Sequence, residues 1–143
     1  MSELSIREIS QDEDFAAWFT ELLEREAVRA GAEASFDDRY LVLTDEIGDW
    51  VGGLRYYLRG GVAHLIDLAI ASEHRHHGYA HRLLAAFEAR AAESQSHLAE
   101  FWTDDQRSEG LLGALGWRRV LVREGYIGRR TWILMEKILG PSL

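Results

Sequence analysis

The sequence contains no cysteine and only one proline among its 143 residues. Without cysteine the chain cannot form a disulfide framework, a thiolate metal site or a cysteine nucleophile. Long hydrophobic runs are also missing. The apolar run 132–135 is far shorter than the roughly 18 residues of a membrane span, and the first ten residues lack the apolar core of a signal peptide. Because 47% of the residues are hydrophobic, we expect one soluble, cytoplasmic domain over residues 1–143, with no membrane partner.

Positive charge is scarce and is carried almost entirely by arginine. The chain has 16 basic against 24 acidic residues, Lys137 is its single lysine, and its net charge is −8. Nucleic-acid binding needs clustered lysine and arginine to neutralise phosphates, so we expect no nucleic-acid partner. The charge is also uneven, because residues 1–49 hold 14 acids and four bases whereas residues 50–143 have a balance of +2.

Hydrophobic periodicity predicts the first elements of the chain. The alternating stretch at residues 4–9 is typical of a short strand. Apolar side chains at i, i+3, i+4 and i+7 from Phe15 predict an amphipathic helix over residues 12–30. Ser10 and Glu13 have the spacing of a capping box at the start of this helix.

The rest of the chain alternates between strand and helix patterns. Three strands joined by turns predict an antiparallel meander over residues 40–44, 50–58 and 62–70. Apolar spacing then predicts a long helix over residues 78–94. Thr103 and Gln106 form a second possible capping box before a short helix that ends at Gly116. The remaining strands are expected at residues 97–103, 117–124 and 130–138. The order β-α-β-β-β-α-β-α-β-β predicts an α/β fold with a mixed (α+β) sheet.

The junction between the third meander strand and the long helix carries the most chemistry. Here Arg75, Gly78 and Ala80 have R-x-x-G-x-A spacing at the start of a helix. The first amides of a helix have no intrahelical acceptor, and the helix dipole adds partial positive charge there. Gly78 lets the backbone approach an anion closely, and Arg75 adds a charge-assisted contact. This segment therefore predicts a phosphate cradle.

With this motif, the chain resembles the GNAT superfamily of N-acetyltransferases, whose acetyl-CoA-binding motif is Q/R-x-x-G-x-G/A. The resemblance extends from the first strand and helix to Leu115-Gly116-Trp117 and the closing strand 132–137. It implies a GNAT-like fold and an enzyme that transfers acetyl from acetyl-CoA, its co-substrate, to a small, cationic primary amine or a peptide amine. It also implies that the coenzyme A pyrophosphate lies on the amides of Arg75, His76, His77, Gly78, Tyr79 and Ala80. The pantetheine would pair with Leu68, Ala69 and Ile70, where two parallel strands splay apart, and the Leu68 amide or a neighbour would hold the oxyanion.

An amine acceptor must lose a proton before it attacks, which calls for a base near the thioester. The candidates are His64 and Asp67 on the third meander strand and Glu100 on the next strand. The ordinary pKa of histidine, about 6.5, suits His64 best. The two carboxylates would need burial or a water relay, and each of the three residues also has an ordinary structural interpretation.

Two departures from the family pattern stand out. Many family members carry in the short helix a tyrosine that protonates the leaving thiolate, but Leu112 occupies that position here. Tyr126 or Tyr79 could replace it, or the thiolate could leave unassisted. The second departure is His76, where glycine is common. A non-catalytic acyl-CoA-binding or regulatory module on the same fold is therefore the alternative, and the absence of G-x-x-x-x-G-K-S/T argues against a nucleotide-phosphate-binding domain.

Other polar and aromatic clusters have simpler interpretations. The histidines at 74, 76, 77 and 81 lack a recognisable ligand set, so we expect no metal. We expect the aromatic residues to lie mostly in the sheet core: Trp50, Tyr56, Tyr57, Trp102 and Trp117. Tyr56 and Tyr57 point to opposite faces, so one of them is a candidate for the acceptor pocket. The closing strands offer a route to a homodimer, and the acidic residues 1–49 are expected to attract a cationic acceptor.

Overall fold

The computed structural model describes residues 4–31 and 37–140. It divides into two compact units, Met1–Ser35 and Phe36–Leu143, so a single domain over the whole chain stays a prediction. In the described residues, no helix combines the length and apolar character required to cross a bilayer.

In the first unit, the predicted helix is present and the predicted strand is not. Residues 4–9 have no regular structure, and no strand pairs with them in the described part of the chain. A strand leaves its backbone polar groups unsatisfied unless a neighbour pairs with it, and alternation alone provides no neighbour. Helix α1, Glu13–Ala30, ends at Gly31, whose φ of 69° is the left-handed cap conformation.

The cap of α1 also differs from the expected capping box. The side chain of Asp12, rather than Ser10, accepts a hydrogen bond from the Phe15 amide at 3.0 Å. Aspartate caps as well as serine, and its charge is further stabilised by the helix dipole. The Phe15 ring contacts the rings of Trp18 and Phe19, but no residue of α1 is buried within this unit.

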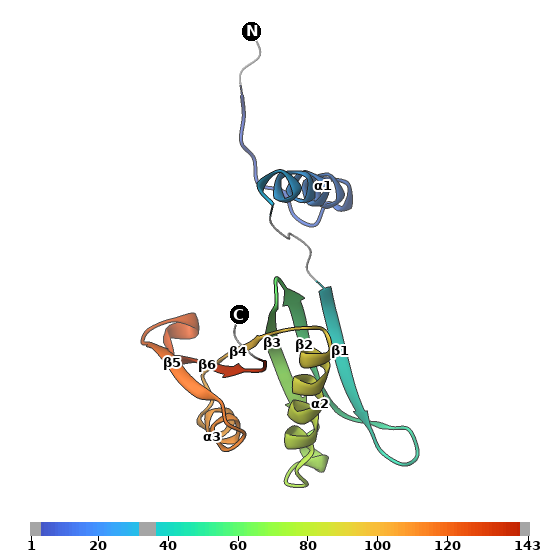
Figure 1. Ribbon diagram of the computed structural model, residues 1–143, viewed down its shortest axis with the longest axis vertical. Coiled ribbons are helices and arrows are strands. Elements are labelled where there is room, and N and C mark those ends of the chain that lie inside the picture. The colour runs from blue at the N-terminus through green and yellow to red at the C-terminus, as the bar shows by residue number, and fades with distance from the viewer. Residues whose placement is uncertain (1–3, 32–36, 141–143) are drawn as a thin grey trace. The chain divides into compact units, whose positions relative to one another are not determined.

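The second unit is built on a six-stranded mixed sheet with the order β1-β2-β3-β4-β6-β5. Figure 1 shows its twist, since the C-terminal strands are turned relative to β1–β3. Only the β3–β4 pair is parallel, and the other neighbours are antiparallel. The strands are β1 Asp37–Thr44, β2 Trp50–Arg59, β3 Val62–Ile70, β4 Leu98–Thr103, β5 Arg118–Arg123 and β6 Trp132–Ile138. The mixed sheet and the meander are therefore confirmed.

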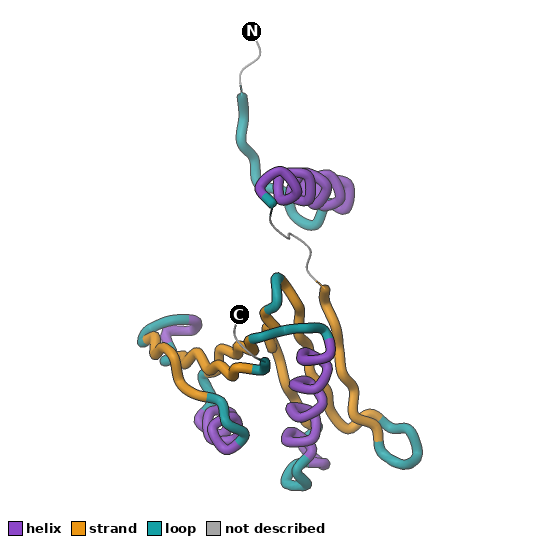
Figure 2. Tube along the Cα trace, in the orientation of Figure 1, coloured by secondary structure: helices purple, strands orange, loops and turns teal. Residues whose placement is uncertain are grey.

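Two helices cover one face of this sheet. Helix α2, Tyr79–Glu93, packs on β1–β3, and α3, Gln106–Ala114, packs on β4 and β6. Short 3₁₀ turns, η1 Ser72–His74 and η2 Ile127–Arg129, precede α2 and β6. Figure 2 distinguishes the helices from the loop that leads from β3 into α2.

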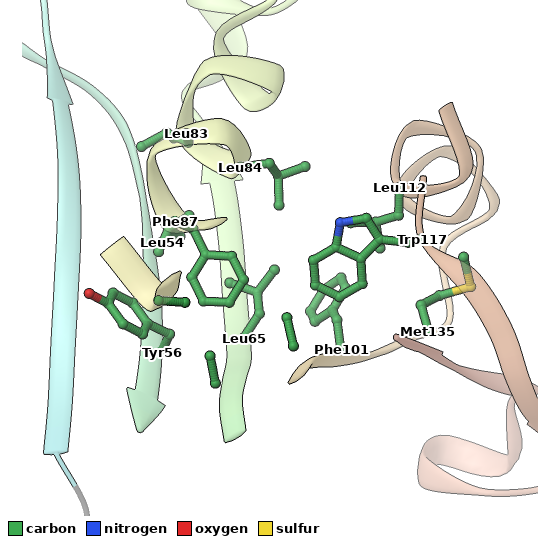
Figure 3. Packing of buried hydrophobic residues seen from close by; sticks show 13 residues of the cluster. Leu54, Tyr56, Leu65, Leu83, Leu84, Phe87, Phe101, Leu112, Trp117 and Met135 are labelled. Atoms are coloured by element: carbon green, nitrogen blue, oxygen red, sulfur yellow. The ribbon is translucent and has the colours of Figure 1, made fainter. Parts of the chain in front are cut away.

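Aromatic rings connect the two halves of the core. Phe87 of α2 packs edge-on against Tyr56 and stacks with Trp117, with ring centroids 5.1 and 6.3 Å apart. Figure 3 shows these three rings among the buried side chains. Tyr56 and Trp117 are buried, as expected of the aromatic set, and Phe87 is buried with them, but Trp50 is 79% exposed. The core cluster also contains Leu54, Leu65, Leu83, Leu84, Phe101, Leu112 and Met135.

The cap of α3 corrects the second expected capping box. Asp105 accepts from the Arg107 amide at 3.0 Å, whereas Thr103 accepts from the Asp105 amide at 3.1 Å. Thr103 ends β4 with its side chain on the core face, so it stabilises the turn and leaves the helix cap to Asp105. Gly116, with φ 92°, follows the end of α3 as expected.

The single lysine of the chain connects three elements at the edge of the core. Lys137 of β6 donates to the Leu115 carbonyl at the end of α3 and pairs with Glu88 of α2. The Trp117 indole donates to the same Glu88 carboxylate at 3.4 Å. The side chains of Lys137 and Glu88 are 28% and 16% exposed, so each would be costly to leave without its partner.

We expect Lys137→Met to lower the free energy of unfolding by about 1–3 kcal/mol, because Glu88 loses its counter-ion and the Leu115 carbonyl loses a donor. Urea denaturation measures this loss. Arg29→Met is the control. Its ion pair with Glu26 lies on α1, and both side chains are mostly exposed, at 81% and 55%, so the loss should stay below about 1 kcal/mol. Equal losses in both variants would contradict the proposed role of Lys137.

Candidate active site

The parallel strands β3 and β4 part after a short paired region. Their pairing runs from Val62–Leu98 to Leu65–Phe101 and stops there. Beyond this point β3 remains paired with β2, and β4 with β6. The sheet therefore has a fork at its centre, where the facing edges of both strands have no strand partner in the described part of the chain. An extended ligand could pair with such an edge.

A β-bulge in β3 lies at the fork. Leu65 pairs with Tyr56 and Asp67 with Arg55, which leaves Ile66 as the extra residue. An extra residue resets the alternation of side chains along a strand. As a result Leu68 and Ile70, beyond the bulge, pack against the helix-covered core.

A pocket of about 480 Å³ opens at the fork. Its lining comes from four neighbouring strands and consists of Tyr57, His64, Leu65, Ile66, Glu100, Phe101, Trp102 and Trp132. Tyr57, His64 and Glu100 form one row across β2, β3 and β4, because Tyr57 pairs with His64 and His64 with Glu100. The row faces away from α2 and α3.

His64 and Glu100, two of the three predicted bases, meet in this pocket. The His64 Nδ1 atom lies 3.3 Å from a Glu100 carboxylate oxygen, and the Tyr57 ring stacks on the imidazole at 4.4 Å. Burial lowers the pKa of His64 below its usual value. Glu100 acts in the opposite direction, and Arg59 adds to the lowering. The imidazole is therefore held in its neutral, proton-accepting form near pH 7.

The other candidate catalytic residues lie elsewhere. Asp67 follows the bulge, is exposed and does not line the pocket. The Tyr126 ring packs against Trp102, a pocket residue, at 5.5 Å. Tyr79 lines a different hollow, between the β1–β2 turn and α2. Leu112, at the position of the family tyrosine, is buried in the core.

The predicted phosphate cradle forms a tight loop before α2. His76 and Gly78 both have left-handed backbone conformations, with φ 68° and 76°. The usual preference for glycine at position 76 follows from this geometry, since a side chain with positive φ is strained. A Cβ at Gly78 would meet no atom within 4 Å. Arg75 donates from Nε to the Ile70 carbonyl at 3.3 Å, which ties the loop to the end of β3.

Several amides of this loop have no hydrogen-bond acceptor within the described residues. In residues 37–140 and 4–31, no hydrogen-bond acceptor is found for the backbone amides of residues 76–81. No group of three or more potential metal-ligating side chains is found in the same ranges. Amides at a helix start that lack acceptors are suited to phosphate oxygens.

Sequence reasoning missed the aromatic walls of the pocket. Trp102 was assigned to the core but lines the pocket, and Trp132 was not singled out. One of Tyr56 and Tyr57 was a candidate for the acceptor pocket, and Tyr57 is the one that lines the pocket at the fork. A usable signal was present for Trp102, which lies two residues after Glu100 and therefore on the same face of β4.

A mixed sheet forked between two parallel strands, with a glycine-containing loop opening the next helix, defines a class of acyl-CoA-dependent transferase folds. The family model described as "Acetyltransferase (GNAT) family" matches residues 4–117, and the chain belongs to this family. GNAT acetyltransferases use acetyl-CoA. No curated protein is significantly similar to the chain in sequence.

Solved structures of similar fold cover nearly the whole chain. A protein from Agrobacterium tumefaciens described as a candidate acetyltransferase is 18% identical with a TM-score of 0.77, over 96% of this chain and 99% of that one. A Bacillus cereus acetyltransferase is 20% identical with a TM-score of 0.72, over 93% and 98%. The ribosomal-protein-S18-alanine N-acetyltransferase of Escherichia coli is 15% identical with a TM-score of 0.69, over 94% of each chain. At these identities the likeness shows the fold alone.

The surroundings of His64 predict opposite effects of two substitutions on its pKa. Glu100→Gln should lower the pKa of His64 further, because the carboxylate stabilises the imidazolium. Arg59→Gln should raise it, because the guanidinium opposes protonation. The ring resonances of His64, followed by NMR against pH, measure both shifts. A rise in the Glu100→Gln variant would show that the two side chains do not interact as described.

Proposed function

We propose that the protein is an acetyl-CoA-dependent N-acetyltransferase whose acceptor is a small primary amine, cationic in solution. The observation that carries this proposal is the His64–Glu100 pair, 3.3 Å apart in a pocket at the fork between β3 and β4. Membership of the GNAT family supports the acetyl donor. A peptide amine is compatible with the same pocket.

The residues of the loop and of β3 suit the donor. The amides and positive-φ residues of the loop 75–80 would receive the pyrophosphate of coenzyme A, with Arg75 adding positive charge. The unpaired edge of β3 from Leu68 to Ile70 would hydrogen-bond to the pantetheine, and the Leu68 amide or a neighbour would donate to the acetyl carbonyl oxygen. Acetyl-CoA supplies an activated acetyl group as a thioester.

His64 acts as the base in this proposal. An amine with an ordinary pKa near 10 arrives protonated at pH 7. The neutral imidazole accepts its proton, directly or through a water, and Glu100 stabilises the resulting imidazolium. The freed lone pair attacks the thioester carbon, the carbon–sulfur bond breaks, and the sulfur of coenzyme A leaves and takes up a proton to form the thiol.

The leaving sulfur is either protonated by a tyrosine or departs unassisted. Leu112 is buried and apolar, so the usual position offers no donor. Tyr126 contacts the pocket residue Trp102 and is the favoured tyrosine candidate, because Tyr79 lines another hollow. Alternatively, a thiol pKa of about 8.5 makes unassisted departure tolerable.

The uneven distribution of charge along the chain also favours a cationic acceptor. The acidic surplus of residues 1–49 would attract a cation, whereas the basic balance of the remainder suits an anionic donor. A preference for neutral or acidic acceptors would count against this part of the proposal. The homodimer and the cytoplasmic location stay predictions.

The direct test follows thiol release from acetyl-CoA in the presence of polyamines, amino acids, arylalkylamines and N-terminal peptides. We expect release that requires an amine, with a rate that falls on the acid side of a pKa below 6.5. His64→Gln should lower the rate and remove this acid limb.

The outcomes distinguish the two functions. Saturable coenzyme A binding without thiol release from any amine would support the non-catalytic acyl-CoA-binding module, which the buried Leu112 favours. A protein that neither binds coenzyme A nor gains thermal stability from it would contradict both. At about 100 times its dissociation constant a ligand adds roughly 2.7 kcal/mol, so binding would be measurable.

Gly78→Glu should weaken coenzyme A binding about 10-fold or more, because it places a negative charge where phosphates are expected. Calorimetric titration measures the affinity. Gly60→Glu is the matched control: this glycine also has positive φ and open space at its Cβ, but it lies in the turn at the opposite end of β3. Equal losses of affinity in both variants would place the phosphate site elsewhere.

A further inference from the structure

Aromatic rings surround the pocket at the fork. Tyr57 of β2, Trp102 of β4 and Trp132 of β6 line it together with the imidazole of His64. Trp102 pairs with Leu134, and Trp132 lies two residues before Leu134, so both indoles belong to the same face of the sheet. This face carries the row of Tyr57, His64 and Glu100. The pocket therefore presents the His64 imidazole among flat aromatic surfaces, with Tyr57 on one side and the two indoles on the other.

The indoles are held in place by neighbours outside the pocket lining. The Trp132 indole nitrogen donates to the Ile127 carbonyl at 2.9 Å. The Trp102 ring packs against Tyr126, and the Arg123 guanidinium lies over both of these rings, at 5.9 and 4.8 Å from their centroids. Rings held this way are pre-organised and lose little conformational entropy when a ligand packs on them.

The charge in and around the pocket suits one cationic group. Glu100 is the single carboxylate among the lining residues, and it already faces His64. Glu136, the next residue across the sheet, is paired with Arg118. On the positive side, Arg59 lowers the pKa of His64 and Arg123 covers the outer aromatic rings. A second ammonium group on the acceptor would find no further carboxylate in the lining and would meet these arginines.

We propose that the acceptor is an arylalkyl monoamine, a single primary amine joined by a short chain to an aromatic ring. The amine lies at His64 and Glu100, and the ring packs against Trp102 and Trp132. The volume of about 480 Å³ accommodates a ring with a short side chain. This assignment rests on the proposed acetyl transfer and specifies its acceptor.

Two primary amines with the same two-carbon chain, one on an aromatic and one on a saturated ring, test the assignment. We compare kcat/KM for 2-phenylethylamine and 2-cyclohexylethylamine, with spermidine as a polycation. Aromatic pairs contribute about 0.5–1.5 kcal/mol beyond the area they bury. We therefore expect the phenyl compound to be preferred about 2- to 10-fold, although the cyclohexyl compound is more hydrophobic. Spermidine should be the poorest acceptor. A preference for spermidine, or equal use of the two ring compounds, would overturn the assignment.

Substitution of Trp102 and Trp132 tests whether their indoles cause the preference for the phenyl compound. Trp102→Leu should reduce the ratio of phenyl to cyclohexyl turnover towards one, and Trp132→Leu serves as a second variant if the first unfolds. Trp50→Leu is the matched control, because Trp50 is 79% exposed at the start of β2 and does not line the pocket. Retention of the full preference in folded Trp102→Leu and Trp132→Leu would exclude the indoles as its source.

Measurements of amine binding distinguish a failure of the arylalkyl assignment from a failure of the proposed acetyl transfer. Calorimetric titration of each amine into the protein saturated with coenzyme A measures affinity without turnover. Turnover of spermidine alone would leave acetyl transfer standing and overturn the arylalkyl acceptor. If no amine releases thiol, acetyl transfer fails, and tighter binding of 2-phenylethylamine than of 2-cyclohexylethylamine would still support the aromatic site. Equal binding or none would then overturn both.

Discussion

The parting of two parallel strands is the constraint on which the rest of the structure depends. Strands β3 and β4 pair over four residues and then diverge, each held by its other neighbour. The stacking of Phe87 with Trp117 joins the parts of the core on either side of the fork. The helices therefore support the sheet on one face, while the opposite face keeps an opening large enough for a ligand. Backbone hydrogen-bonding capacity that a regular sheet would use internally becomes available at this opening.

The chemistry of the site follows from ordinary strand geometry at the fork. Side chains two residues apart share a face, and residues paired across strands lie side by side. These two rules place His64 beside Glu100 and Trp102 one step further along β4. Partial burial then favours the neutral imidazole, while the Glu100 carboxylate lies close enough to stabilise an imidazolium. The aromatic rings and the His64–Glu100 pair thus result from the same strand register.

Much of the fold could be predicted from the sequence, and the errors have physical causes. The limits of β3 were predicted as observed, because alternation and glycine turns act locally. The strand at 4–9 was wrong, because pairing requires a partner that a local pattern does not supply. Both expected capping boxes were wrong because Asp12 and Asp105 stood closer to the true helix starts. In the site, residues 75–80 were predicted to form one loop leading into α2. The bulge that separates Asp67 from the pocket could not be foreseen, since it depends on the register with β2.

By itself the sequence determined the mixed α/β class, and it predicted a phosphate cradle before α2 and a short set of candidate bases. Each of these depends on residues close together along the chain, whose local spacing controls backbone conformation and hydrogen bonding. Only the tertiary structure decided that His64 and Glu100 form a pair, that Leu112 is a core residue and that two indoles face a pocket. Those outcomes depend on strand register and on the position of the fork. Both result from packing between segments distant in the sequence.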